Sequence, residues 1–254
     1  LIIGQFLPPH LSWGFNWWAE LPQVIRWVAP AVAAALLIPG ASAVLGQTIG
    51  RALISVTEFV ERQNRILSGV AGAAVLAAVL FLLRVKCFLF GDGITILESV
   101  ASGGALSFKA QMALQPLGVV VNDLWFSSLS RFTDLAPDAM LALLSSLGGA
   151  TALVGMWKIS GELGKGGAGR LLVFAFGLTS GVCMLFFGYL ENYIWPTAML
   201  LWSLASCLVY VRTKREGLSA IVFAGVGTAF HFVLAPQLVL ATVLVWSRGR
   251  VFAG

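Results

Sequence analysis

The sequence predicts an all-α, polytopic integral membrane protein. The expected fold is a helical bundle of about five full spans, with a C-terminal re-entrant pair of short helices and further interfacial helices. Only 11% of its 254 residues are charged and 59% are hydrophobic, whereas soluble domains carry about 25% charged residues. Several apolar runs approach the roughly 20 residues that cross a bilayer. Lysine and arginine gather in short clusters between these runs, as topology signals of membrane proteins do.

Residues 1–66 form the first of two predicted parts of the chain. Residues 1–23 are rich in Trp and Pro ("HLSWGFNWWAELP"), which favours an interfacial segment with its indole rings at headgroup depth. A first span is predicted at residues 27–46. Residues 47–66 mix charged with apolar residues, a pattern typical of an amphipathic helix that lies on the membrane surface.

Residues 67–254 form the second part, the predicted transmembrane core. Its full spans are expected at residues 67–85, 138–157, 171–190 and 193–211. Between the first two spans, residues 91–135 form a connection of mixed polarity, and a structureless loop of that length would be unusual. We therefore predict two short interfacial helices there, at residues 93–102 and 116–130.

The last apolar run, from Gly217 to Trp246, has 30 residues and no formally charged side chain. As one helix it would be roughly 45 Å long, against about 30 Å of hydrocarbon in a bilayer. His231 and Pro236 lie near the middle of the run. The run is therefore predicted to form a re-entrant hairpin of two short helices.

Three basic loops predict the orientation of the bundle. They are residues 47–66, 158–170 and 212–216. Placing all three inside gives a self-consistent topology. Arg248 and Arg250 return to the inside only if the last run is a hairpin, whereas Arg84 and Lys86 fall on the outer side as exceptions.

This topology gathers unusual polar residues on the outer side of the membrane. They are Asp92 in "LFGDGITILES", Glu191 with Asn192 in "FFGYLENYIWP", and His231 in "GTAFHFVLAPQ". Carboxylates and a histidine around one cavity could support general acid–base chemistry on a lipid-linked substrate. Lys109 and Arg131 lie in the outer connection, where they could hold phosphate oxygens or contact lipid head groups.

Each of these sites also has a structural interpretation. Asp92, between two glycines, could cap the helix predicted to begin at residue 93. Glu191 could be the polar tip of an interfacial turn, with Tyr193 in an aromatic belt. His231 could be a packed, hydrogen-bonded histidine or the axial ligand of a pigment or haem. A haem held by two histidines is disfavoured, because the only other histidine, His10, lies near the N-terminus.

The remaining features concern partners and the extent of the chain. The net charge of +5 does not indicate a nucleic-acid partner, because the cations sit in the topology clusters. The three cysteines lie in or beside apolar runs without metal-like spacing.

The glycine-rich "GELGKGGAGR" lacks the Ser or Thr and the preceding strand of a phosphate-binding loop, and it is predicted to be a flexible turn. The start lacks the pattern of a signal peptide, and we expect the chain to be a piece of a longer protein.

Three stretches carry a resemblance to a known family. "LFGDGITILESVASGGALSFKAQMALQPLGVVVNDLW" resembles the first outer loop of bacterial multispan proteins with the GT-C glycosyltransferase fold, in which an acidic residue follows a span and two interfacial helices come next. "FFGYLENY" is similar to a turn motif of these proteins, and "HFVLAPQLVL" resembles their short-helix hairpin. The resemblance covers roughly residues 67–246.

The resemblance implies transfer of a sugar from a polyprenyl-phosphate donor to an acceptor at the outer face of the bacterial cytoplasmic membrane. Asp92 would be the general base that activates the acceptor, although loop one here has a single Asp where many members carry paired acids. The residues that would bind substrate are Glu191, Asn192, Tyr193, His231, Lys109 and Arg131. The last two would contact the lipid phosphate, and the use of a divalent metal stays open.

The alternative function is a non-catalytic transmembrane subunit that uses a shortened GT-C-like scaffold within a larger membrane complex. The Trp-rich start and the many small residues favour such contacts with other membrane subunits. Family proteins also usually continue with further spans. A transporter is disfavoured, because no acid or base is predicted at mid-span depth and no inverted repeat is evident.

Overall fold

The structure is a computed structural model that describes residues 65–84, 93, 96–98, 114–178 and 193–250, with isolated positions between 23 and 55. Within these residues every regular element is a helix, which confirms the predicted all-α class. The helices are α4 (Arg65–Leu82), α7 (Pro116–Leu129), α8 (Pro137–Leu163), α9 (Gly166–Leu178), α10 (Ile194–Thr213), α11 (Gly217–Phe230), the 3₁₀ helix η4 (Phe232–Leu234) and α12 (Ala235–Arg250).

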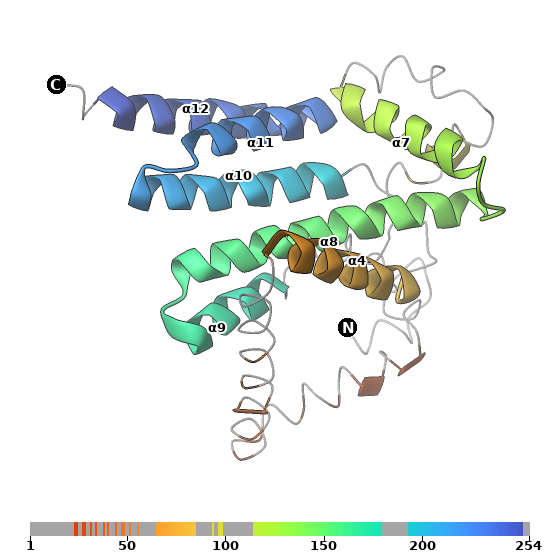
Figure 1. The fold of residues 1–254 in the computed structure, drawn as a ribbon, viewed down its shortest axis with the longest axis horizontal. Coiled ribbons are helices and arrows are strands. Elements are labelled where there is room, and N and C mark those ends of the chain that lie inside the picture. Colours follow the sequence, from red (N-terminus) through yellow and green to blue (C-terminus); the bar gives the residue numbers. More distant parts are fainter. Residues whose placement is uncertain are drawn as a thin grey trace, which may run out of the picture.

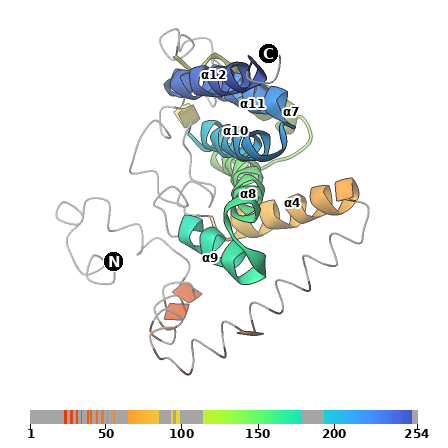
Figure 2. The ribbon, with the colours of Figure 1, turned by 90° about the vertical axis from the view of Figure 1, so that its left-hand side faces the viewer.

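The two longest helices form the centre of the bundle. α8 and α10 lie side by side and run in the same direction, α11 packs against α10, and α12 packs against α11 (Figure 1). Viewed along the helices, these four form a row, and α4 and α9 lie on two sides of α8 (Figure 2). α7 contacts α8 and α11 at the end of the bundle where α8 and α10 begin.

Small residues on α8 allow α10 to approach it closely. A Cβ atom added at Gly148 would lie 3.0 Å from Ile194 Cγ1, and one added at Gly155 would lie 3.1 Å from Trp202 Cδ1. Ala152, between the two glycines, is fully buried. Small residues at this spacing leave room for the large side chains of α10 to lie directly against the α8 backbone, a use of small residues also found in membrane helix pairs. This close contact explains the central place of α8 and α10.

α8 and α10 are also the described helices that are long and apolar enough to cross a membrane. They match the spans predicted at residues 138–157 and 193–211, and α8 extends beyond its predicted range at its C-terminal end. α4 covers most of the span predicted at 67–85. α9 covers the start of the one predicted at 171–190, whose remainder lies outside the described residues. Of the span predicted at 27–46, only isolated positions are described, and the full five-span bundle stays a prediction.

The two segments predicted as interfacial helices are helical where the structure describes them, and their position at an interface stays a prediction. α7 confirms the helix predicted at residues 116–130. The described positions of the helix predicted at 93–102 are helical, and Ile96 is buried against Leu141 of α8. The Trp-rich segment and the amphipathic surface helix expected in the first 66 residues lie, apart from isolated positions, outside the described residues.

The apolar run from Gly217 to Trp246 forms two helices, as predicted. α11 ends at Phe230, and His231 has an extended backbone with φ −157° and ψ 122° before η4 leads into α12. Pro236 is the second residue of α12, where a missing N–H removes no intrahelical hydrogen bond. The chain therefore reverses near His231, and α12 runs back along α11 (Figure 1).

The glycine-rich sequence between α8 and α9 is more helical than predicted. α8 continues to Leu163 and α9 begins at Gly166, so only two residues separate the helices. Gly166 has a φ of 66°, a conformation that glycine adopts without strain. A Cβ atom at Gly164 would overlap with the backbone of Arg170, so the turn is tight as well as short.

The helix directions give the bundle two chemically different ends. α8, α10 and α12 all finish at one end, which holds the charged residues of 158–170 and 212–216 and the end of α12 at 248–250; we call it the basic end (Figure 1). At the opposite end α8 and α10 begin and α11 turns into α12. We call it the His231 end, and it carries Tyr193 and His231. The predicted hairpin thus returns the chain to the end with the other basic loops.

Candidate functional site

Tyr193 and His231 bring two of the predicted polar sites together at the His231 end. Tyr193 is the residue before α10, and His231 is the residue between α11 and η4. Their rings stack, with centroids 4.9 Å apart and planes inclined by 30°. Glu191 and Asn192 immediately precede Tyr193 in the chain. The end of the "FFGYLENY" motif and the break between α11 and α12 therefore meet.

The backbone fixes the hydrogen-bonding role of the His231 ring. The Val233 N–H donates to His231 Nδ1 at 3.1 Å, so this side chain caps η4. A neutral imidazole whose Nδ1 accepts a hydrogen bond carries its proton on Nε2. The packed, hydrogen-bonded role considered for His231 is therefore present. The same arrangement makes Nε2 the nitrogen that can donate a hydrogen bond.

A small cavity lies at this end between α7, α8, α10 and α11. Its volume is about 20 Å³, which is room for about one water molecule. Asn122, Ser145 and Trp195 give it a partly polar lining, and the Trp195 ring stacks on Phe230 with centroids 5.8 Å apart. The buried Trp195 Nε1–H makes no hydrogen bond within the described part of the chain. Buried donors are rarely left unpaired, so a water molecule fits this space chemically as well as sterically.

The other predicted site residues are placed as follows. Asp92, Lys109, Glu191 and Asn192 lie outside the described residues. Arg131 lies in the exposed turn between α7 and α8, at the His231 end, where its backbone N–H donates to the Ser128 carbonyl oxygen at 3.3 Å. Among the described ranges, no group of three His, Cys, Asp or Glu side chains is arranged to hold a metal ion.

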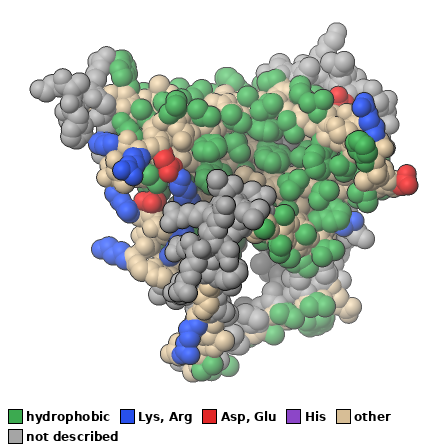
Figure 3. Space-filling view, in the orientation of Figure 1, with side chains coloured by type: hydrophobic (Ala, Val, Ile, Leu, Met, Phe, Trp, Pro, Cys, Tyr) green, Lys and Arg blue, Asp and Glu red, His purple; other side chains and the backbone are tan. Residues whose placement is uncertain are grey.

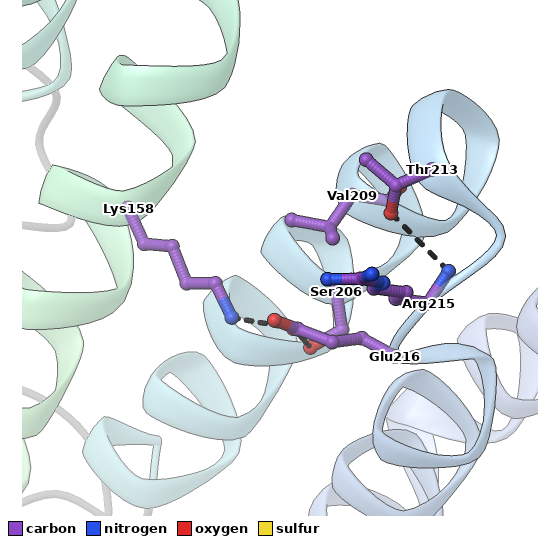
Figure 4. A network of polar contacts seen from close by, with 6 residues as sticks. All are labelled: Lys158, Ser206, Val209, Thr213, Arg215 and Glu216. Carbon is purple, nitrogen blue, oxygen red and sulfur yellow. Dashed lines mark hydrogen bonds and ion pairs between the residues drawn. The ribbon is translucent and has the colours of Figure 1, made fainter.

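A second polar cluster lies at the basic end, where sequence reasoning placed charges but no contacts. Lys158 Nζ on α8 lies 2.5 Å from Glu216 Oε2, and the Ser206 hydroxyl donates to the same oxygen at 3.2 Å (Figure 4). Lys158 also lies over the Trp202 ring, 5.4 Å from its centroid. This cluster ties α8 and α10 to the turn that begins α11. No motif could have found it, because Lys158 and Glu216 are 58 residues apart.

The turn between α10 and α11 has an unusual backbone that serves this cluster. Lys214 and Glu216 have φ values of 63° and 65°. This left-handed conformation costs a residue with a side chain roughly 1–2 kcal/mol. The Arg215 N–H donates to Thr213 Oγ1 at 3.2 Å within the turn (Figure 4). The turn directs the Glu216 carboxylate inward, while Lys214 and Arg215 are exposed.

Comparison of the chain with protein-family models, with curated proteins and with solved structures gives no match. The functional argument therefore depends on the residues and geometry of the chain itself. Two features carry it: the stacked Tyr193–His231 pair at one end of the bundle, and the charged cluster around Lys158 and Glu216 at the other.

Proposed function

We propose that the chain is a multispan glycosyltransferase of the GT-C type in the bacterial cytoplasmic membrane, and that it transfers a sugar from a polyprenyl-phosphate donor on the outer side. The observation that supports this most is the stacking of Tyr193 on His231, 4.9 Å between centroids. It joins the segment after Glu191 to the short-helix hairpin, two regions that a transferase site would need together. The length and apolar character of α8 and α10 support the placement in a membrane.

The packing of Ile96 supports a place for loop one at the same end. Ile96 is buried in a cluster with Leu141 near the start of α8. Ser145, one helical turn further along α8, lines the cavity beside the stacked rings of Trp195 and Phe230. Asp92 precedes Ile96 by four residues in the sequence. A site that combines the loop-one acid with the histidine is therefore compatible with the packing of the described segments.

In the proposed reaction Asp92 acts as the general base. It takes the proton of an acceptor hydroxyl while the acceptor oxygen bonds to the anomeric carbon of the donor sugar. The bond between that carbon and the phosphate oxygen breaks, and polyprenyl phosphate leaves with one more negative charge. Donors and cations near the leaving phosphate would stabilise this charge. His231 Nε2, Lys109 and Arg131 are the groups proposed for that role.

Two substitutions at His231 separate its capping role from its proposed substrate role. In His231→Asn, the side-chain oxygen can replace Nδ1 as the acceptor for the Val233 N–H, but no donor reaches the position of Nε2. In His231→Gln, the amide nitrogen can reach the Nε2 position, but the cap is lost. We expect His231→Asn to lose only the ring stack with Tyr193, about 1 kcal/mol of stability, and to lower transfer about tenfold or more, as loss of a hydrogen bond to a charged group does.

The matched variant His231→Gln should show the opposite pattern. Loss of the cap is expected to make His231→Gln about 1 kcal/mol less stable than His231→Asn, while transfer by His231→Gln stays within a few-fold of the unmodified chain. Thermal unfolding and initial transfer rates, measured on the same preparations, check both expectations. If both variants keep full transfer, His231 acts only as a cap and does not contact the substrate.

A non-catalytic membrane subunit is the second candidate function. The observation that favours it is the size of the cavity beside Trp195, which has a volume of about 20 Å³ and admits a water molecule rather than a sugar. On this interpretation the His231 end is closed, and the Tyr193–His231 stack serves only to join α10 to the hairpin. Partner subunits would then cover apolar faces such as that of α12, where Val239 and Leu240 are exposed.

A transfer assay distinguishes the two functions. The full chain, reconstituted in vesicles, is supplied with polyprenyl-phosphate sugars labelled in the sugar, together with a membrane fraction that contains acceptors. The transferase proposal predicts time-dependent release of polyprenyl phosphate and movement of the label to an acceptor. Recovery of the labelled donor intact, with the chain co-purifying in a stable membrane complex, would support the subunit function instead.

A further inference from the structure

Charges are distributed unequally between the two ends of the bundle. The described part of the basic end carries the cations Lys158, Lys165, Arg170, Arg212, Lys214 and Arg215. Its acids are Glu162 and Glu216. Figure 3 shows lysine and arginine side chains gathered over this end, while apolar side chains cover much of the middle of the molecule.

Both acids at the basic end are already engaged by cations. Glu216 pairs with Lys158, and Glu162 Oε2 lies 3.1 Å from Arg212 Nη1. Among the described residues of this end, the cations therefore outnumber the acids. Lys214 and Lys165 are exposed, so the excess positive charge faces outward from the ends of the helices.

Three of these cations lie over aromatic rings. The Arg170 guanidinium is 3.9 Å from the centroid of Trp157, and Lys214 Nζ is 5.5 Å from that of Tyr210. The third is Lys158, over Trp202. Tryptophan and tyrosine are enriched at the level of lipid head groups, and long basic side chains reach toward the same level. Tyr210 is buried and its hydroxyl donates to the Val245 carbonyl oxygen, so the surface of the basic end is formed by the exposed cations rather than by this ring.

The turn between α10 and α11 places two exposed cations at this surface. With Glu216 in the left-handed conformation, its carboxylate is directed to Lys158 and Ser206. The neighbouring Lys214 and Arg215 are exposed.

We propose that the basic end binds the phosphate-bearing head groups of anionic phospholipids in the leaflet that it faces. Lys214 and Arg215 provide the main contacts, with Lys165 beside the turn between α8 and α9. Charge complementarity identifies this partner: an exposed cationic surface meets a layer of phosphodiesters. The inference depends on the membrane placement proposed above and is independent of the transfer reaction.

The test compares two lipids on the full chain in detergent micelles. Phosphatidylglycerol or phosphatidylcholine is titrated in, and bound lipid is counted by native mass spectrometry at low and high salt. Phosphatidylglycerol should bind at least tenfold more tightly, and raised salt should reduce this preference because the contact is electrostatic. In Lys214→Gln/Arg215→Gln the apparent Kd for phosphatidylglycerol should rise roughly fivefold for each cation removed.

Three controls make the outcome specific. Lys214→Arg/Arg215→Lys keeps both charges and should keep the preference, which separates charge from any folding defect. Arg84→Gln removes a cation beside Phe81, which packs on Leu141 near the start of α8 at the other end of the bundle, and it should leave the preference unchanged. Inorganic phosphate and a nucleic-acid oligomer are added as competitors. Equal binding of the two lipids would overturn the proposal. So would an equal loss of phosphatidylglycerol affinity in the Lys214→Gln/Arg215→Gln variant and in the single Gln control, or displacement of the lipid by nucleic acid.

Discussion

Replacement of Asp92 by Asn is expected to lower the rate of sugar transfer by about a hundredfold or more, because positioned general bases contribute 10²–10⁴-fold to such steps. Asparagine has nearly the same shape as aspartate but cannot accept the proton of an acceptor hydroxyl. Binding of the polyprenyl-phosphate donor should change little, since the proposed contacts to its phosphate come from other residues. Initial rates at saturating donor, together with the donor Kd, check the two expectations separately.

Asp123→Asn is the matched control for this substitution. Asp123 lies on an exposed face of α7, and its replacement by Asn removes the same charge as Asp92→Asn does. Transfer by this variant should stay within about twofold of the unmodified chain, the level at which surface substitutions normally act. If Asp92→Asn transfers sugar as fast as Asp123→Asn does, Asp92 is not the base, and its capping interpretation becomes the better one.

The second large effect is expected in the packing between α8 and α10. Gly148→Leu should destabilise the chain by about 3 kcal/mol or prevent folding, because overpacking a close helix contact forces the backbones apart. A Cβ atom at this position already meets Ile194 at 3.0 Å and Trp195 at 3.3 Å, before the rest of a leucine side chain is added. Thermal unfolding of the purified protein measures the loss, with a midpoint lowered by roughly 5–10 °C.

Gly72→Leu provides the comparison for Gly148→Leu. A Cβ atom at Gly72 on α4 meets no atom within 4 Å, so a leucine there has room to extend outward. Glycine is also a poor helix former, and its replacement in an open helical position should gain up to about 1 kcal/mol. Equal destabilisation by the two substitutions would mean that α8 and α10 are not in the close contact described.

The broad architecture follows from hydrophobic patterning, because run length and interruption are local properties of a sequence. The reversal of the chain at His231 was predictable for this reason: a run of 30 apolar residues is too long for one span, and His231 and Pro236 interrupt it. The helical form of residues 166–170 was not predictable, because glycine has a low helix propensity. In this stretch the Arg170 side chain packs on the Trp157 ring, although the glycine-rich composition disfavours a helix.

The candidate site was predictable only in part, because its contacts depend on tertiary packing as well as on local sequence patterns. Sequence patterns placed Tyr193 and His231 on the same side of the bundle, and the structure brings their rings into contact. The role of His231 Nδ1 as a cap depends on the backbone of Val233, which no composition argument could supply. The pair formed by Lys158 and Glu216 depends on tertiary packing between residues far apart in the chain.

The most direct measurement is an experimental structure of the full chain in a lipid bilayer, determined with a polyprenyl-phosphate sugar and any co-purifying subunits. The transferase proposal predicts that the Asp92 carboxylate, Glu191 and His231 Nε2 surround an open cavity on the side away from the basic end. The separation between Asp92 and His231 should be roughly 10 Å or less, a distance over which two groups can act on one sugar. A much larger separation, or a partner subunit that fills the space between them, would contradict catalysis and support a structural role for this end of the bundle.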